Sequence, residues 1–408
     1  MLYVWVALVF LVGAAVGSFI NVCVARLPFE KSILWPQGSR CGHCLQPIRW
    51  YDNLPLVSYW VLGGRCRSCG RRYGVSYFLV ELLTAALFAG LFYLEIGRNV
   101  LGLRLIDRHH DDIVTWGAIP WQAWAVFGWH ALLLSFLLTT SLCDLAHLEV
   151  PLPVTVCGTV VGLVGSAFLA WPFPESGWTP PRPDQRLATP FPPGLYPWPV
   201  WPPWDLPAWM GPGTWQLGLA TGLAGALAGL VMLRGVRFLF GLGRGKEGLG
   251  IGDADMMMMA GAFVGWQPIV AGFFIGVFAA LFVGVAQLLR KGDHPLAFGP
   301  ALAIGVLAAV LLWNPLAGGR DAPLFVLFSV LYHLWWLGPG IIVGGALILL
   351  TCAFLLRLIR GGGPAPAAPA AGGAPAPPAP AAPGGEGIVT AESKEGIVKA
   401  ESADLKKE

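Results

Sequence analysis

The chain has 408 residues, of which 56% are hydrophobic and only 12% are charged, about half the charge of an average soluble domain. This composition excludes an ordinary soluble protein and makes the lipid bilayer the first expected partner. The net charge of +3 is small, and the basic residues stand in short loops rather than along one helix face. No nucleic-acid partner is therefore expected.

The first apolar run, residues 3–24, is either a signal peptide or a retained helix. No basic residue precedes it, and its positive charges, Arg26 and Lys31, follow it. That order is the reverse of a cleaved signal peptide. It predicts a retained first helix whose N-terminus lies outside the cytoplasm.

Further apolar runs are long enough to cross a bilayer, which takes about 20 helical residues. The run 256–289 suits two passes with a break at Gln267 and Pro268, and a shorter run at 324–337 is expected to be re-entrant or interfacial. The predicted fold class is an all-α polytopic membrane protein with about eight or nine transmembrane helices. The expected spans are 3–24, 76–97, 121–143, 151–171, 214–235, 256–289, 296–313 and 340–357.

Basic loops orient these helices. Residues 25–75 contain eight basic and two acidic residues, and the segments 234–255 and 290–291 are also basic. Since positive loops stay in the cytoplasm, we expect all three there and the loops 98–120 and 172–213 outside. The predicted location is the plasma (inner) membrane.

Four cysteines in the first basic loop form two CxxC pairs, Cys41 with Cys44 and Cys66 with Cys69. Two such turns complete a tetrahedral Zn²⁺ site, and four protein ligands leave no open position, so a structural zinc in a small zinc-ribbon-like loop is predicted. Disulfides are the alternative, but a loop in the reducing cytoplasm disfavours them. His43 is expected to be a bystander.

Two segments are not expected to be helical. Residues 172–213 are rich in Pro and Trp and suit an extended external loop at headgroup level, although a partner-binding role is an alternative. The Gly/Pro/Ala-rich tail, 361–408, is expected to be disordered.

Two aspartates are expected at the cytoplasmic ends of different helices. Asp144 ends the span 121–143, and Asp253 precedes the helix that starts at Met256. Charges beside membrane spans are costly and tend to mark function. Peptide hydrolysis without a metal needs one carboxylate as a general base and a protonated carboxyl to polarise the carbonyl. Two carboxyls that share a proton supply both.

Plainer interpretations of the aspartates remain open. Either one is also explained as a helix cap or as an interfacial charge, and Asp255, Glu149 and His147 compete for the same roles. Gly250 and Gly252 would let a substrate backbone approach closely, although a simple turn explains them equally well. The methionine run 256–259 is expected to be helix packing.

Several motifs, taken together, resemble bacterial type IV prepilin peptidases. They occur in the family's order and cover residues 10–313. They are GSFINVCVARLP at 17–28, the two CxxC pairs, VSYFLVELLT at 75–84, GIGD at 250–253 and Phe298-Gly299-Pro300.

The resemblance implies an aspartic endopeptidase that removes the basic leader of type IV prepilins or type II secretion pseudopilins at the cytoplasmic membrane face. It gives Asp144 and Asp253 the catalytic positions and the four cysteines the zinc positions. It also implies a possible second activity, N-methylation of the new N-terminus with S-adenosylmethionine. The expected domains are 1–97, with the zinc loop at about 25–75; 121–313, the aspartic peptidase domain; 314–360, an added membrane segment; and the tail.

The chain departs from the family's pattern at two single positions: Leu152 follows Pro151, where the family often has Asp or Asn, and Asp255 stands where the family usually has lysine. The insert 172–213 and the C-terminal extension also lie outside the pattern. These departures bear on methylation and on substrate choice. The alternative functions are an intramembrane protease of the glycine-aspartate type, a proton-coupled transporter and a secretion scaffold.

Overall fold

The computed structural model describes residues 1–33, 39–168, 209, 214–244, 250–289, 297–317, 323–324, 327 and 337–359. Within these residues every regular element is a helix, and only two isolated β-bridges occur. The predicted all-α class is therefore confirmed. The tail 361–408, the insert 172–213 apart from Trp209, and most of the run 324–337 lie outside the described residues.

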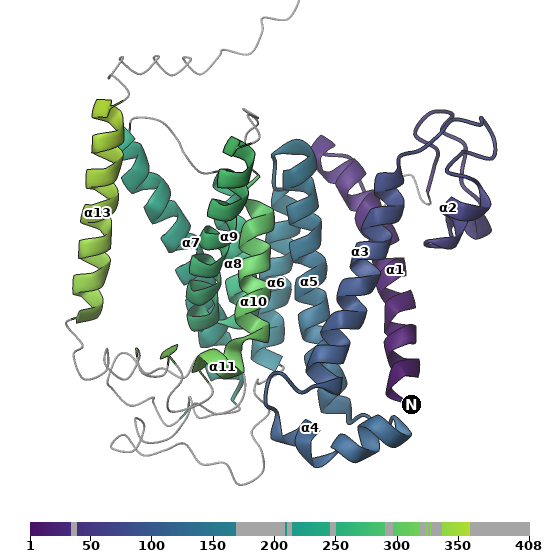
Figure 1. The fold of residues 1–408 in the computed structure, drawn as a ribbon, viewed down its shortest axis with the longest axis horizontal. Helices are drawn as coiled ribbons and strands as arrows, with labels where there is room; N and C mark the ends of the chain where they lie inside the picture. The colour runs from purple at the N-terminus through teal and green to yellow at the C-terminus, as the bar shows by residue number, and fades with distance from the viewer. Residues whose placement is uncertain are drawn as a thin grey trace, which may run out of the picture. The chain divides into compact units, whose positions relative to one another are not determined.

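The long helices follow the predicted spans (Figure 1). Five of the described helical segments are long and apolar enough to cross a membrane, and Leu152–Phe168, Gly299–Leu311 and Pro339–Ile348 are shorter apolar helices. The principal helices are α1 (Leu2–Arg26), α3 (Val75–Phe92), α5 (Trp121–His147), α6 (Leu152–Phe168), α7 (Trp215–Arg244), α8 (Ile251–Val264), α9 (Trp266–Leu289), α10 (Gly299–Leu311) and α13 (Leu337–Ile359).

Glycines bring α1 and α3 close together. A Cβ on Gly13 would lie 2.8 Å from the Cβ of Phe88, and one on Gly17 would lie 2.8 Å from the Cα of Glu81. The four-residue spacing puts both glycines on one face of α1, which is how small residues let helices pack in a membrane. This contact places the cytoplasm-facing end predicted for α1 beside the start of α3.

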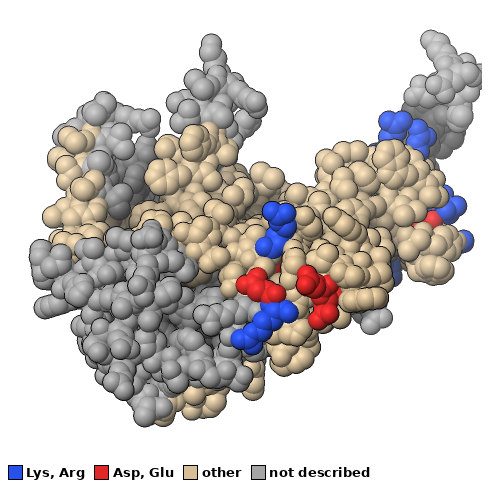
Figure 2. Space-filling view, turned by 60° about the horizontal axis from the view of Figure 1, so that its bottom comes forward, with Lys and Arg blue, Asp and Glu red and all other residues tan. Residues whose placement is uncertain are grey.

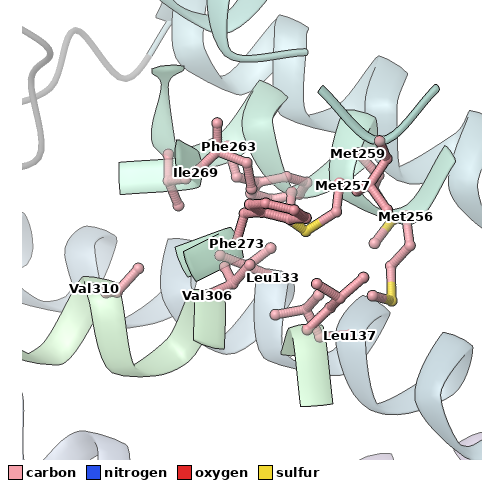
Figure 3. Packing of buried hydrophobic residues seen from close by; sticks show 14 of the residues in the cluster. Leu133, Leu137, Met256, Met257, Met259, Phe263, Ile269, Phe273, Val306 and Val310 are labelled. Carbon is pink, nitrogen blue, oxygen red and sulfur yellow. The ribbon is translucent and has the colours of Figure 1, made fainter. Parts of the chain in front are cut away.

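The largest buried cluster lies among α5, α7, α8, α9 and α10 (Figure 3). Met256, Met257 and Met259 of α8 are fully buried in it and pack with Leu137 and Phe273. The prediction that the methionine run serves helix packing is confirmed. Flexible, unbranched methionine fits the irregular gaps among several crossing helices.

The run 256–289 breaks two residues earlier than predicted. Helix α8 ends at Val264, Gly265 has a φ of 83°, and α9 starts at Trp266, so Pro268 falls in the first turn of α9. Positive φ favours glycine, and proline is tolerated in a first helical turn. With 14 residues, α8 is about 21 Å long, shorter than a hydrocarbon core of about 30 Å.

A buried hydrogen-bonded pair, absent from the sequence predictions, joins the chain just after α3 to α5. After α3 the chain continues as a π-helix, η3 (Tyr93–Gly97), where Glu95 is fully buried. Its Oε1 lies 2.6 Å from Nδ1 of His130 on α5. The pair fixes the end of α3 that lies far from the cysteine loop.

The two ends of the helices carry different charges. The cysteine loop, with the short helix α2 (Val57–Val61), lies at one end, and α4 (Arg104–Arg108) lies at the other (Figure 1). Figure 2 shows a mixed group of acidic and basic side chains on the face that carries α4. The exposed charged residues there are Arg98, Asp107, Arg108, Asp111 and Asp112.

Candidate functional site

The four predicted zinc ligands meet in one cluster. The Sγ atoms of Cys41, Cys44, Cys66 and Cys69 all lie within 4.8 Å of one another. Cys41 and Cys69 are 3.8 Å apart, and Cys44 and Cys66 are 4.0 Å apart. A tetrahedron with Zn–S bonds of about 2.3 Å has edges of about 3.8 Å, whereas a disulfide bond is about 2.05 Å long. The cysteines therefore fit a zinc ion, and all four are free thiols.

The two CxxC turns share one backbone design. In each, the residue after the second cysteine has positive φ, 59° at Leu45 and 69° at Gly70. Its N–H donates to the carbonyl oxygen of the first cysteine, at 3.0 Å for Cys41 and 2.9 Å for Cys66. An isolated β-bridge closes each turn, Arg40 with Pro47 and Arg65 with Arg72. The turns are thus two copies of one ligand-presenting loop.

The backbone of each turn favours the thiolate form of its first cysteine. The backbone N–H groups of Cys44 and His43 lower the pKa of Cys41 to about 6. The backbone N–H groups of Cys69 and Ser68 likewise lower the pKa of Cys66. Hydrogen bonds to the charged form stabilise that form, and zinc binds thiolate rather than thiol. Among the described residues, the metal-ligand cluster contains no histidine, which agrees with the expectation for His43.

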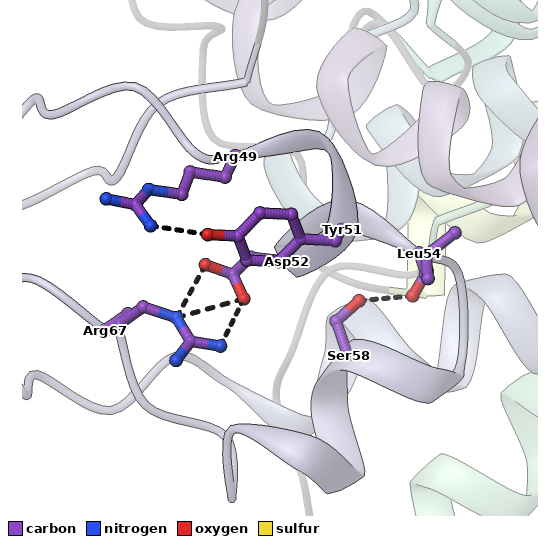
Figure 4. Close-up of polar contacts among 6 residues, drawn as sticks. All are labelled: Arg49, Tyr51, Asp52, Leu54, Ser58 and Arg67. Carbon is purple, nitrogen blue, oxygen red and sulfur yellow. Dashed lines mark hydrogen bonds and ion pairs between the residues drawn. The ribbon is translucent and has the colours of Figure 1, made fainter.

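An ion pair braces the cysteine loop (Figure 4). The guanidinium of Arg67 donates Nε and Nη2 hydrogen bonds to the Asp52 carboxylate, with Nη2 to Oδ1 at 2.6 Å. Arg67 holds the pKa of Asp52 below its usual range. A neighbouring guanidinium, that of Arg49, donates to the hydroxyl of Tyr51. The residues between the two CxxC turns are therefore tied back to the second turn.

Glu81 attaches the cysteine loop to α3. Its Oε2 accepts the N–H of Leu56 at 2.8 Å. Leu56 has a φ of 64° and precedes α2, a conformation that costs a branched side chain energy. The carboxylate therefore holds a strained backbone turn in place and fixes the cysteine loop against the membrane helices.

Asp144 lies in the last turn of α5, which continues four residues beyond the predicted end of the span at 143 and ends at His147. It is 7% exposed. Its Oδ2 accepts the backbone N–H of Gly299 at 2.8 Å. A Cβ on Gly299 would lie only 2.7 Å from that oxygen, so the first residue of α10 must be glycine for this contact. A helix N-terminus also attracts a carboxylate.

Asp253 lies in the first turn of α8 and is 6% exposed. The charge of Asp144 acts on it, so the two carboxyls lie within electrostatic range. Within the described part of the chain, neither carboxyl forms an ion pair. The structure thus brings together the two predicted aspartates from α5 and α8, beside the first turn of α10.

The competing residues are placed differently. Asp255 pairs with Arg234 of α7 at 3.3 Å. Glu149 is exposed. His147 is also exposed, and its ring packs against that of Phe29 with the ring centroids 5.1 Å apart. Among the residues that the structure describes, the buried carboxyls without a cationic partner are therefore Asp144 and Asp253.

The two predicted glycines lie beside Asp253. A Cβ on Gly250 would lie 3.3 Å from Oδ2 of Asp253, and one on Gly252 would lie 2.6 Å from the Cβ of Val150. Because Gly250 has no side chain, no Cβ at this position lies against the Asp253 carboxyl. Because Gly252 has none, Val150 in the loop between α5 and α6 can pack closely against α8. Substrate approach at both glycines stays a prediction.

Sequence reasoning missed two partners, the Gly299 amide and Arg234. In the sequence, Phe298-Gly299-Pro300 carries only the family resemblance, although a glycine before a proline at a helix start indicates a bare backbone N–H at a helix N-terminus. Arg234 stood in a basic loop, with nothing in the sequence to tie it to Asp255.

The fold and the two sites define a class: a polytopic α-helical membrane protein with a four-cysteine metal loop and a buried pair of carboxyls. Residues 11–94 match the family model for the bacterial peptidase A24 N-terminal domain.

Three relatives share most of the chain, and each is a prepilin leader peptidase/N-methyltransferase. That of Pseudomonas aeruginosa is 30% identical over 331 residues, 74% of this chain and 89% of the relative. That of Pectobacterium carotovorum is 29% identical, over 76% of this chain and 93% of the relative. That of Myxococcus xanthus is 27% identical, and the chain spans 63% of its length. No solved structure matches the chain.

The chain belongs to the prepilin leader peptidase/N-methyltransferase family. It is therefore a membrane-embedded enzyme of the peptidase class.

Proposed function

We propose that this enzyme is an aspartic endopeptidase that removes the leader of type IV prepilins, or of type II secretion pseudopilins, at the cytoplasmic face of the inner membrane. The observation that carries the proposal is the pairing of Asp144 with Asp253, two buried carboxyls from separate helices that interact electrostatically. The names of the relatives supply the substrate class.

The pair would share one proton, because two close carboxyls in a site of low dielectric do not both ionise. The ionised member takes a proton from water as the water attacks the scissile carbonyl, and the protonated member hydrogen-bonds to the carbonyl oxygen. The Gly299 N–H occupies Oδ2 of Asp144, which leaves Oδ1 for the water. Gly250 leaves Asp253 open to an extended substrate backbone.

The remaining parts take supporting roles in this proposal. The four cysteines hold a structural zinc ion, since all four positions of the tetrahedron are filled by protein. Residues 1–97 form the N-terminal domain, 121–313 the peptidase domain and 314–360 an added membrane segment. The second activity named in the relatives, N-methylation, would use S-adenosylmethionine as its methyl donor.

Asparagine at either aspartate tests the peptidase. Asp144→Asn and Asp253→Asn should each lower leader cleavage by at least about a hundredfold, because each removes a general acid or base. The measurement is the mass of a purified prepilin after incubation with the purified enzyme. Glu149→Gln is the matched control, since Glu149 is exposed, and it should cleave at the normal rate.

Normal cleavage by either asparagine variant would refute the dyad. The cleavage site decides between the proposal and the intramembrane protease, because the proposal requires a cut at the leader junction. A cut inside the membrane helix of the substrate would favour the alternative.

A further inference from the structure

A cavity of about 640 Å³ lies between the cysteine loop and the ends of α1 and α3, and the peptidase mechanism does not use it. Its volume is in the range typical of small-molecule and cofactor sites, about 300–1,000 Å³. The lining residues come from three parts of the chain that meet only in the fold: Asn21 from α1, Tyr59 and Arg72 from the cysteine loop, and Glu81 from α3.

The charges of the cavity suit a ligand with an anionic group. Six arginines and two acidic residues line it. Among the described residues, Arg71 and Arg72 make no side-chain hydrogen bond or ion pair, while Arg67 is engaged by Asp52. A basic prepilin leader would be repelled here, because like charges in a cleft disfavour binding. A carboxylate or a phosphate would be attracted.

Three aromatic side chains of the lining, here called the aromatic wall, suit a ring and a cation. Tyr59, Tyr73 and Phe78 line the cavity and contact one another, with ring centroids 5.7 Å apart for Tyr59 and Tyr73 and 5.3 Å for Tyr59 and Phe78. Such rings stack on a planar base and attract cations. Glu81 also lines the cavity, and its charge acts on Tyr73. A ligand that spans the cavity would thus carry a planar ring, a positive centre and an anionic group.

The cavity is separated from the carboxyl pair by one helix. Residues of α1 line the cavity, whereas Cys23 of the same helix lies within electrostatic range of Cys143, the residue before Asp144. Just beyond α1, Phe29 packs on His147 of α5. The cavity and the last turn of α5, which carries Asp144, therefore both border the end of α1.

We propose that this cavity binds S-adenosylmethionine, with Arg71 and Arg72 facing its carboxylate, the aromatic wall its adenine and Glu81 its positive centre. This inference rests on the N-methylation included in the proposed function and gives it a location. The donor would supply a methyl group to the new amine, which loses a proton while the sulfur keeps the bonding electrons.

Binding of radiolabelled S-adenosylmethionine to the full-length enzyme in lipid nanodiscs tests the proposal. The wild type should bind about one donor per chain. Arg72→Ala and Glu81→Gln should each weaken binding by about tenfold or more, because each removes a charge-assisted contact. Arg65→Ala is the matched control. Arg65 forms the isolated backbone β-bridge with Arg72 in the same loop, but it does not line the cavity. It should bind normally.

Because Glu81 also fixes Leu56, zinc content is measured in every variant to verify the loop. Ultraviolet crosslinking of the bound donor should label peptides that contain Tyr59 or Tyr73. Labelling elsewhere, or normal binding by Arg72→Ala, would overturn the proposal. A third outcome would also overturn it: the wild type binds no donor but retains phosphatidylglycerol, and Arg72→Ala loses that lipid. The cavity would then be a lipid headgroup site.

The Asp253→Asn variant separates this inference from the peptidase. It should bind the donor with wild-type affinity while leader cleavage is lost. Cleavage without any donor binding in the wild type would remove the cavity assignment and leave the peptidase. Donor binding together with normal cleavage by Asp253→Asn would refute the peptidase dyad and leave the cavity assignment in place.

Discussion

At the scale of single residues, the backbone N–H of Gly299 sets the position of Asp144. The contact measures 2.8 Å, and the space around it admits no side chain. The aspartates could be predicted from the sequence because charge beside a membrane span is rare and costly. The role of the Gly299 N–H could not be predicted, because every residue except proline carries a backbone N–H. Only the packing of α10 shows which N–H contacts Asp144.

Gly299→Ala should lower kcat/KM for leader cleavage by about tenfold to a hundredfold. Its Cβ would overlap Oδ2 of Asp144, and a displacement of about 1 Å is enough to cost a hundredfold. Gly128→Ala is the control, because a Cβ at Gly128 of α5 meets no atom within 4 Å. Unchanged kinetics for Gly299→Ala would show that the contact does not position the carboxyl.

Cys41→Ser should abolish zinc binding, since a four-thiolate site loses a quarter of its ligands. We expect about one zinc ion per wild-type chain and none in the variant by elemental analysis of the purified protein. Cys157→Ser should keep the zinc, because Cys157 is an exposed residue of α6 outside the cluster. Zinc retained by Cys41→Ser would contradict the assignment.

At the scale of elements, hydrophobic runs located most helices, and local backbone chemistry decided where they end. The break before α9 follows Gly265 rather than Pro268, because glycine supplies the positive φ and proline fits a first turn. The pairing of Glu95 with His130 joins residues 35 apart in the chain. No local pattern signals such a tertiary contact.

Glu95→Ala should destabilise the helix bundle by about 1–3 kcal/mol, because it removes the buried carboxyl that hydrogen-bonds to His130. Thermal unfolding in detergent, followed by loss of helical circular dichroism, would measure this as a lower Tm. Glu149→Ala removes an exposed carboxylate and should leave Tm unchanged. An equal Tm for both variants would show that the buried pair adds no stability.

At the scale of the whole bundle, the cysteine loop and α4 lie at opposite ends of the helices (Figure 1). Composition predicted the membrane class, and the basic loop predicted which end faces the cytoplasm. The relative placement of α5, α8 and α10 required the structure, because lipid-facing and protein-facing sides of apolar helices have similar composition.

Labelling of single new cysteines tests this orientation. A membrane-impermeant maleimide should label Asp111→Cys in intact spheroplasts and should label Arg65→Cys only after permeabilisation. Both positions are exposed. Arg65 belongs to the cysteine loop and Asp111 follows α4, and these two segments lie at opposite ends of the helices. Labelling of Arg65→Cys from outside would invert the proposed topology.

The contact between Gly299 and Asp144 also has a consequence for biosynthesis. The two aspartates reach the membrane with α5 and α8, but the group that holds Asp144 arrives with α10, 155 positions later in the chain. A ribosome-bound chain that has not yet released α10 therefore lacks an assembled site. Under the proposed role of Asp144, newly made enzyme gains peptidase activity only when translation has passed that helix.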